Sequence, residues 1–134
     1  MKKITTLMLS LLCMVAFTIT EVSAQQTDNK KAKIEAPVLE HNFGTFKEGD
    51  GAVSHVFKIK NTGGAPLVIT RVLSSCGCTT PSFSKEPIAP GKSGQITVTY
   101  DPAGRVYPFV KTISVYSNGK EGPLVLTIKG EVVK

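Results

Sequence analysis

Apolar and polar residues alternate with a period of two in five separate segments of this chain. Successive side chains of an extended strand point to opposite faces, so this alternation is typical of strands with one buried face. β-branched residues are frequent in these segments, and no stretch after residue 36 offers three turns of helical periodicity. We therefore expect an all-β fold, with strands around residues 53–59, 67–70, 96–100, 112–116 and 124–129.

Turn-forming residues separate these segments at short intervals. Gly49 to Gly51, Asn61 to Gly64 and Asp101 to Gly104 all have turn composition. Asn118 and Gly119 lie between two alternating segments and predict a hairpin. This spacing predicts about seven short strands, which favours an immunoglobulin-like antiparallel β-sandwich, with a small β-barrel as the alternative.

The predicted core consists of the apolar residues on one side of each strand. The chain has no tryptophan and no cysteine pair spaced to join two sheets, so an antibody-type core is excluded. The expected core residues are Phe43, Phe57, Ile59, Leu67, Ile69, Ile96, Val98, Tyr100, Ile113, Val115, Leu126 and Ile128.

The first 24 residues have the composition of a secretory signal peptide. Lys2 and Lys3 precede an apolar run over residues 4–19, and Val22 to Ala24 supply small residues at a cleavage site. The run is shorter than the ~20 residues that a membrane-spanning helix needs. We expect cleavage after Ala24 and export to the periplasm, the cell surface or the extracellular space, with no membrane span in the mature chain.

The remaining chain is expected to have two parts. Residues 25–36 are polar and charged and lack aromatic residues, which is typical of a flexible linker. Residues 37–134 then form the sandwich, a length that is sufficient for one domain with one core.

The formal net charge of +6 is modest, and the basic residues are scattered. No basic stripe alternates with aromatic residues, so nucleic acid is not an expected partner. No serine lies in a Gly-x-Ser-x-Gly motif, and acidic residues occur singly near turns. The sequence therefore predicts no catalytic residues of the hydrolase type and no cofactor.

Cys76, Gly77 and Cys78 are the most distinctive site candidate. The only other cysteine, Cys13, lies in the predicted signal peptide. In an exported protein the two thiols tend to close into a disulfide, and we expect Gly77 to allow the positive φ that so short a ring would need. Such a disulfide would be a local clamp or, if strained, a redox-active pair.

Two other states of the pair stay open: free thiols without a special role, and metal binding. Thiolates one residue apart suit a soft ion such as Cu(I), whereas a closed zinc site needs two more ligands. The only imidazole candidates are His41 and His55, which lie far upstream. A nearby cation would favour redox activity, because it lowers the pKa of a thiol.

Several ordered motifs make the chain resemble a known family. They are HNFGTF at 41–46, HVFKIKNTG at 55–63, PLVI at 66–69, SCGCT at 75–79, IAPGKSG at 88–94, DP at 101–102 and YSN at 116–118. The chain resembles the bacterial domain of unknown function 1573 over residues 38–132. The resemblance implies an immunoglobulin-like sandwich related in shape to major sperm protein and to abnormal-spindle and hydin domains. It implies no established activity.

Together these features predict a non-catalytic binding or structural module of the bacterial envelope, whose partner is a protein or an envelope component. The loop with Ser75, Gly77 and Thr79 around the cysteines would be displayed to that partner. The alternative is a thiol–disulfide redox protein or a Cu(I) carrier that uses Cys76 and Cys78. Arg71 and Lys85 are the cations nearest to the pair in sequence.

Overall fold

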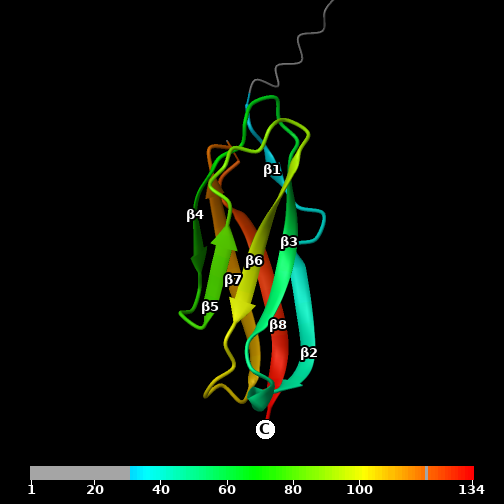
Figure 1. Cartoon of the computed structure of the whole chain (residues 1–134), viewed down its shortest axis with the longest axis vertical. Coiled ribbons are helices and arrows are strands. Elements are labelled where there is room, and N and C mark those ends of the chain that lie inside the picture. The colour runs from blue at the N-terminus through cyan, green and yellow to red at the C-terminus, as the bar shows by residue number, and fades with distance from the viewer. Residues whose placement is uncertain (1–30, 120) are drawn as a thin grey trace, which may run out of the picture.

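The computed structural model describes residues 31–119 and 121–134, which form two four-stranded sheets packed face to face (Figure 1). The predicted signal peptide and the first part of the predicted linker lie outside the described residues. The elements are β1 (Ile34–Glu35), β2 (Glu40–Lys47), the 3₁₀ turn η1 (Glu48–Asp50), β3 (Val53–Asn61), β4 (Ile69–Ser74), β5 (Thr79–Phe83), β6 (Ser93–Tyr100), β7 (Pro108–Ser117) and β8 (Leu124–Val133).

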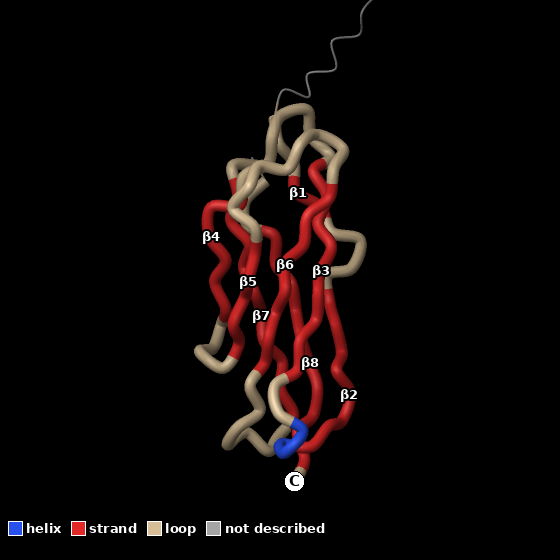
Figure 2. The backbone as a smooth tube through the Cα atoms, in the orientation of Figure 1, coloured by secondary structure: helices blue, strands red, loops and turns tan. Residues whose placement is uncertain are grey.

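One sheet has the strand order β1-β3-β6-β5 and the other has the order β2-β8-β7-β4. Almost all regular structure in the described residues is strand (Figure 2). The predicted immunoglobulin-like sandwich is therefore confirmed. One pair differs from a fully antiparallel arrangement, because β2 runs parallel to β8. The chain crosses from β1 in one sheet to β2 in the other, so no hairpin forces β2 to oppose its neighbour.

Ordered structure begins inside the segment predicted to be a linker. Ile34 pairs with Asn61 as part of β1, and Ala32 and Ile34 are buried. The two apolar residues alternate with Lys31, Lys33 and Glu35, and these charges made the segment look like solvated chain. The folded domain therefore starts upstream of Pro37.

The predicted core residues lie between the two sheets. All are buried except Phe43, which is partly buried and packs against the core from β2. The core also contains Phe109, whose ring stacks on that of Tyr100 with centroids 3.8 Å apart. Alternation along the strands identifies the inward face because that face is consistently buried.

The connection between β7 and β8 is an antiparallel hairpin, and its turn includes more residues than Asn118 and Gly119. β7 ends at Ser117 and β8 begins at Leu124. Asn118 is used differently: its side chain accepts from the Val68 amide at 2.8 Å and donates to the Pro66 carbonyl at 3.0 Å. It therefore fixes the loop that enters β4.

Within the described residues, no helix has the length and apolar character needed to span a bilayer.

The disulfide loop and the open sheet edge as candidate functional sites

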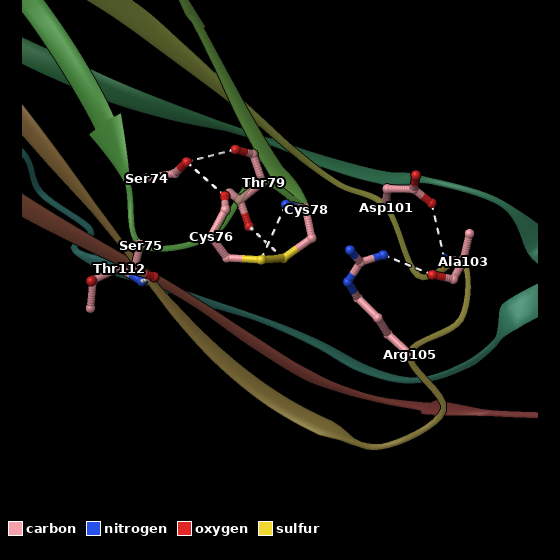
Figure 3. Close-up of a disulfide and its surroundings, with 9 residues drawn as sticks. All are labelled: Ser74, Ser75, Cys76, Cys78, Thr79, Asp101, Ala103, Arg105 and Thr112. Carbon is pink, nitrogen blue, oxygen red and sulfur yellow. Dashed lines mark hydrogen bonds between the residues drawn. A yellow bond between two sulfur atoms is a disulfide. The ribbon is translucent and has the colours of Figure 1, made fainter.

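The two cysteines lie in the short loop that joins β4 to β5. These strands are the edge strands of the two sheets on one side of the sandwich, so the loop links one sheet to the other. Cys76 and Cys78 form a disulfide, with their Cα atoms 5.2 Å apart. This Cα separation lies in the range that disulfides ordinarily span. Of the states that the sequence left open, the structure shows the disulfide (Figure 3).

Local hydrogen bonds hold the loop in shape. The hydroxyl of Ser74 donates to the carbonyl oxygens of Cys76 at 2.9 Å and Thr79 at 2.8 Å. The Thr79 amide also donates to the Cys76 carbonyl at 3.2 Å. One serine therefore ties together the residues on both sides of the disulfide.

Two neighbouring segments anchor the loop from outside. The Ser75 amide donates to the Thr112 carbonyl on β7 at 3.0 Å, and the Thr112 amide donates to the Ser75 hydroxyl at 3.2 Å. On the other side, the Asp101 amide donates to the Cys78 carbonyl at 2.9 Å. The backbone around the disulfide is thus fixed to both sheets.

The two sulfurs have different surroundings. Cys78 is only 4% exposed and belongs to the core, whereas Cys76 is partly exposed. The backbone amide of Cys78 donates to Cys76 Sγ at 3.1 Å. Cys78 Sγ has only the weaker contact with Thr79 Oγ1, at 3.8 Å. The accessible sulfur therefore also receives the better hydrogen bond.

Two expectations about the loop are wrong. Gly77 is not among the described glycines with positive φ, and a Cβ built on it would meet nothing within 4 Å. The ring closes without a left-handed glycine. Thr79 is 2% exposed because it begins β5 on the inward side, so it is not displayed. Ser75 and Gly77 are exposed.

Figure 3 draws Arg105, a residue that the sequence did not suggest, in the surroundings of the disulfide. Arg71 stacks over the ring of Tyr116, with its guanidinium carbon 4.1 Å from the ring centroid. Figure 3 shows Arg105 on the loop after β6, on the side of that loop that faces the disulfide. The guanidinium donates to the Ala103 carbonyl at 2.7 Å. Arg105 lies 27 residues beyond Cys78 along the chain, so its place beside this loop could not be predicted from the sequence.

The two histidines lie on the opposite side of the sandwich, on β2 and β3. Their rings stack with centroids 3.7 Å apart and an angle of 9° between the ring planes. Burial of the His55 ring, together with the facing His41, lowers the pKa of His55. The structure therefore does not bring His41 or His55 to the cysteines. The described residues contain no group of three or more side chains that could hold a metal ion.

The side of the sandwich that carries β2 and β3 also has an open sheet edge. β1 covers β3 only at Lys60 and Asn61, so residues 53–58 have no strand on their outer side among the described residues. The other edges are irregular: β5 contains Pro81, and the pairings of β2 and β4 show register shifts. Proline and bulges protect edge strands from pairing. The first part of β3 has neither.

The direction of the backbone groups on β3 follows from its known bonds. The Asn61 amide points to the β6 side, where it donates to Lys92, and the Thr62 amide points to the β1 side, where it donates to Lys33. Because these directions alternate along a strand, the amides of Ser54, Val56 and Lys58 face the open edge.

The family model for proteins of unknown function DUF1573 matches residues 34–132. The chain belongs to this family. No curated protein matches it. Among solved structures, a protein of unknown function from Porphyromonas gingivalis W83 is 21% identical with a TM-score of 0.67. That alignment covers 80% of this chain and 50% of the other, so this chain spans half of that protein's length.

A second solved structure, the ASH / PapD-like domain of human CEP192, is 12% identical with a TM-score of 0.65. The alignment covers 89% of this chain and 98% of the human domain. At such identities the likeness shows the fold alone. This DUF1573 domain therefore has an immunoglobulin-like, PapD-like fold, with nearly the extent of one such domain.

Proposed function

We propose that this DUF1573 domain is a non-catalytic binding module that is exported to the bacterial envelope. Its partner is a protein or envelope component that contacts the open edge of β3, the exposed part of the disulfide loop, or both. The signal-peptide composition of residues 1–24 supports export. The observation that carries the binding role is the regular open edge at residues 53–58.

The open edge is suited to pairing with an extended segment of a partner. The amides and carbonyls of Ser54, Val56 and Lys58 would form the main-chain hydrogen bonds of an added strand. The side chains that alternate along the edge would give specificity. Val56 is 48% exposed on the outer face of the sheet, where an added strand would bring a side chain beside it.

The edge can be tested with a single amide. Val56→Pro removes an outward-facing amide and leaves the ladder to β6 intact, whereas Val56→Thr keeps the amide and the β-branched shape. We expect the tagged wild-type protein and Val56→Thr to retain a partner from bacterial envelope extracts and Val56→Pro to lose it. Retention by all three proteins would exclude the edge as the binding surface.

The loop is tested in the same experiment. Substitution of the exposed Ser75 by a bulky residue changes the surface while Cys76 and Cys78 stay paired. Loss of the partner with this variant, but not with Val56→Pro, would assign binding to the loop. If neither variant changes what is retained, and the purified protein turns over a dithiol, the module hypothesis fails.

A second candidate function is a thiol–disulfide redox protein, and the closed bridge with one accessible sulfur favours it. Exchange requires that a thiolate reach one sulfur of the disulfide. The related possibility of a Cu(I) carrier would need both thiols reduced, because a closed disulfide has no thiolate to donate. Redox titration against glutathione tests this candidate: a bridge that stays closed over the whole range of glutathione buffers would exclude it.

A further inference from the structure

The disulfide is asymmetric in three independent respects. Cys76 is partly exposed and Cys78 is buried. The Cys78 amide donates to Cys76 Sγ at 3.1 Å, and no backbone amide of the described residues donates to Cys78 Sγ. The carbonyl of Cys78 accepts from Asp101 on a second segment, whereas the carbonyl of Cys76 accepts from Ser74 and Thr79, the strand residues that flank the loop. Each difference gives the two sulfurs different roles.

We propose that the Cys76–Cys78 disulfide exchanges with a dithiol, that Cys76 is the sulfur that bonds to the partner, and that Cys78 is the resolving sulfur. This inference rests on the second candidate function and specifies its chemistry. It does not depend on the edge of β3.

The first step is the attack of a partner thiolate on Cys76 Sγ. A new S–S bond joins the partner to Cys76 as the bond between Cys76 and Cys78 breaks. The electron pair of the broken bond goes to Cys78 Sγ, which takes up a proton. Access decides which sulfur is attacked, since an incoming thiolate must approach in line with the bond and Cys78 is enclosed by the core.

The second step releases the partner. The other thiolate of the partner attacks the partner's own sulfur in the mixed disulfide, and Cys76 leaves as a thiolate. The Cys78 amide, which already donates to this sulfur, stabilises the negative charge that develops there. In sum the dithiol loses two electrons and two protons and becomes a disulfide, while Cys76 and Cys78 become two thiols. A partner disulfide reverses the sequence.

The framework of the loop keeps the resolving sulfur in place. Ser74 bonds the carbonyls of Cys76 and Thr79, and Asp101 bonds that of Cys78, so these contacts do not require the disulfide itself. After reduction, Cys78 stays close to Cys76. This proximity favours ring closure over accumulation of the mixed disulfide.

Single-cysteine variants of the full mature chain test the assignment. Cys78→Ser leaves the Cys76 thiol and Cys76→Ser leaves the Cys78 thiol. We expect iodoacetamide at pH 7 to alkylate Cys78→Ser at least about tenfold faster than Cys76→Ser, and oxidised glutathione to form a stable adduct only with Cys78→Ser. Equal rates, or faster reaction of Cys76→Ser, would overturn the assignment. Circular dichroism checks that both variants are folded.

A measurement on the native sequence guards against a variant that does not fold. Wild-type protein reduced with dithiothreitol is treated with less than one equivalent of iodoacetamide, and the modified cysteine is located by peptide mass. Modification mainly at Cys76 supports the proposal, and modification mainly at Cys78 refutes it. If dithiothreitol does not open the bridge in the folded protein, the redox function itself fails. If it does open and Cys78 reacts first, only this inference fails.

Discussion

Two fully buried polar side chains lie toward opposite ends of the sandwich. They differ in how completely their polar atoms are hydrogen-bonded. Asn61, at the end of β3, has both side-chain atoms paired. Tyr100, which pairs with Thr79 beside the disulfide, has a buried hydroxyl that finds no hydrogen-bond partner among the described residues. In Figure 1 the loop after β3 lies at the top, and the loops after β4 and β6 lie toward the bottom.

Asn61 organises its end of the molecule with one side chain. Its amide group donates to the carbonyls of Ala65 at 2.7 Å and Ile88 at 2.9 Å, and its oxygen accepts from the amides of Gly63 at 3.0 Å and Lys33 at 3.3 Å. Three segments therefore meet at this buried group: the chain at Lys33, the loop after β3 and the chain at Ile88. Most of these groups would lose their partner with the side chain.

The end with the disulfide is held together differently. The loops there are joined by main-chain bonds, by the Ser74 hydroxyl and by a bridge between residues two apart. Bonds of this kind remain when the bridge opens, and a partly exposed group there can be rehydrated. One end of this fold is therefore specified by a buried side chain, and we expect the backbone bonds at the other end to persist when its disulfide opens.

The largest expected effect is that of removing the Asn61 amide. Asn61→Leu keeps the branched shape but removes the side-chain hydrogen bonds to two amides and two carbonyls in three segments, so we expect a loss of about 3–5 kcal/mol in the free energy of unfolding. Urea denaturation measures it. Asn42→Ala is the matched control, because Asn42 accepts one bond from Gly44 in an exposed position. A loss below about 1 kcal/mol for Asn61→Leu would contradict the comparison.

A pair of glycine substitutions tests the two ends with the same chemical change. A Cβ at Gly63 would contact the carbonyl oxygen of Lys31 and come within 2.6 Å of the Lys33 amide, whereas a Cβ at Gly77 would meet nothing within 4 Å. We expect Gly63→Ala to cost about 2 kcal/mol by displacing the chain that leads into β1, and Gly77→Ala to be neutral or slightly stabilising. Thermal unfolding of both variants measures the difference, and equal shifts would contradict it.

Features that depend on local sequence pattern could be predicted, whereas features that depend on contacts between distant segments could not. Alternation predicted the strands and most of the core because one face of each sheet is buried. The disulfide was foreseeable as one of several states because its cysteines are neighbours in the chain. The role of Asn61 could not be foreseen from the sequence, because its partners Lys33 and Ile88 lie 28 and 27 residues away. Arg105 and the uneven burial of the two sulfurs depend on tertiary packing in the same way.

Reduction of the bridge should have a smaller effect on stability than either change at the Asn61 end. The disulfide closes a ring of only three residues, so opening it restores little entropy to the unfolded chain, and we expect a loss below about 2 kcal/mol. Urea unfolding with and without dithiothreitol, with the Cys76→Ser/Cys78→Ser double variant as reference, measures it. Cooperative unfolding on reduction would show that the bridge, and not the backbone bonds, holds this end together.

Acid should weaken the molecule on its open side rather than at either end. The lowered pKa of His55 means that the unfolded chain takes up a proton first as the pH falls. The stabilisation is therefore complete above the ordinary histidine pKa, near 6.5, and is lost as the pH falls from there to the lower pKa of the folded state. Hydrogen exchange at pH 7.5 and pH 5, corrected for the pH dependence of the intrinsic exchange rate, should show lower protection factors in β2 at the lower pH. His55→Phe, which keeps a ring in the stack, should remove this difference, and its persistence would assign the effect to another group.

The smallest effect on the free energy of unfolding is expected at Tyr100. This variant tests most directly whether the two ends differ in their dependence on buried hydrogen bonds. Tyr100→Phe keeps the ring stacked on Phe109 and removes a buried hydroxyl that has no partner in residues 31–119 and 121–134. Because the hydroxyl is desolvated without a compensating bond, we expect the free energy of unfolding to stay the same or to rise by up to about 1 kcal/mol. Tyr116→Phe, a change at a partly exposed tyrosine, is the control. A loss above about 1 kcal/mol for Tyr100→Phe would mean that a bound water or a neighbouring group pairs with the hydroxyl, and both ends would then depend on satisfied buried polar groups.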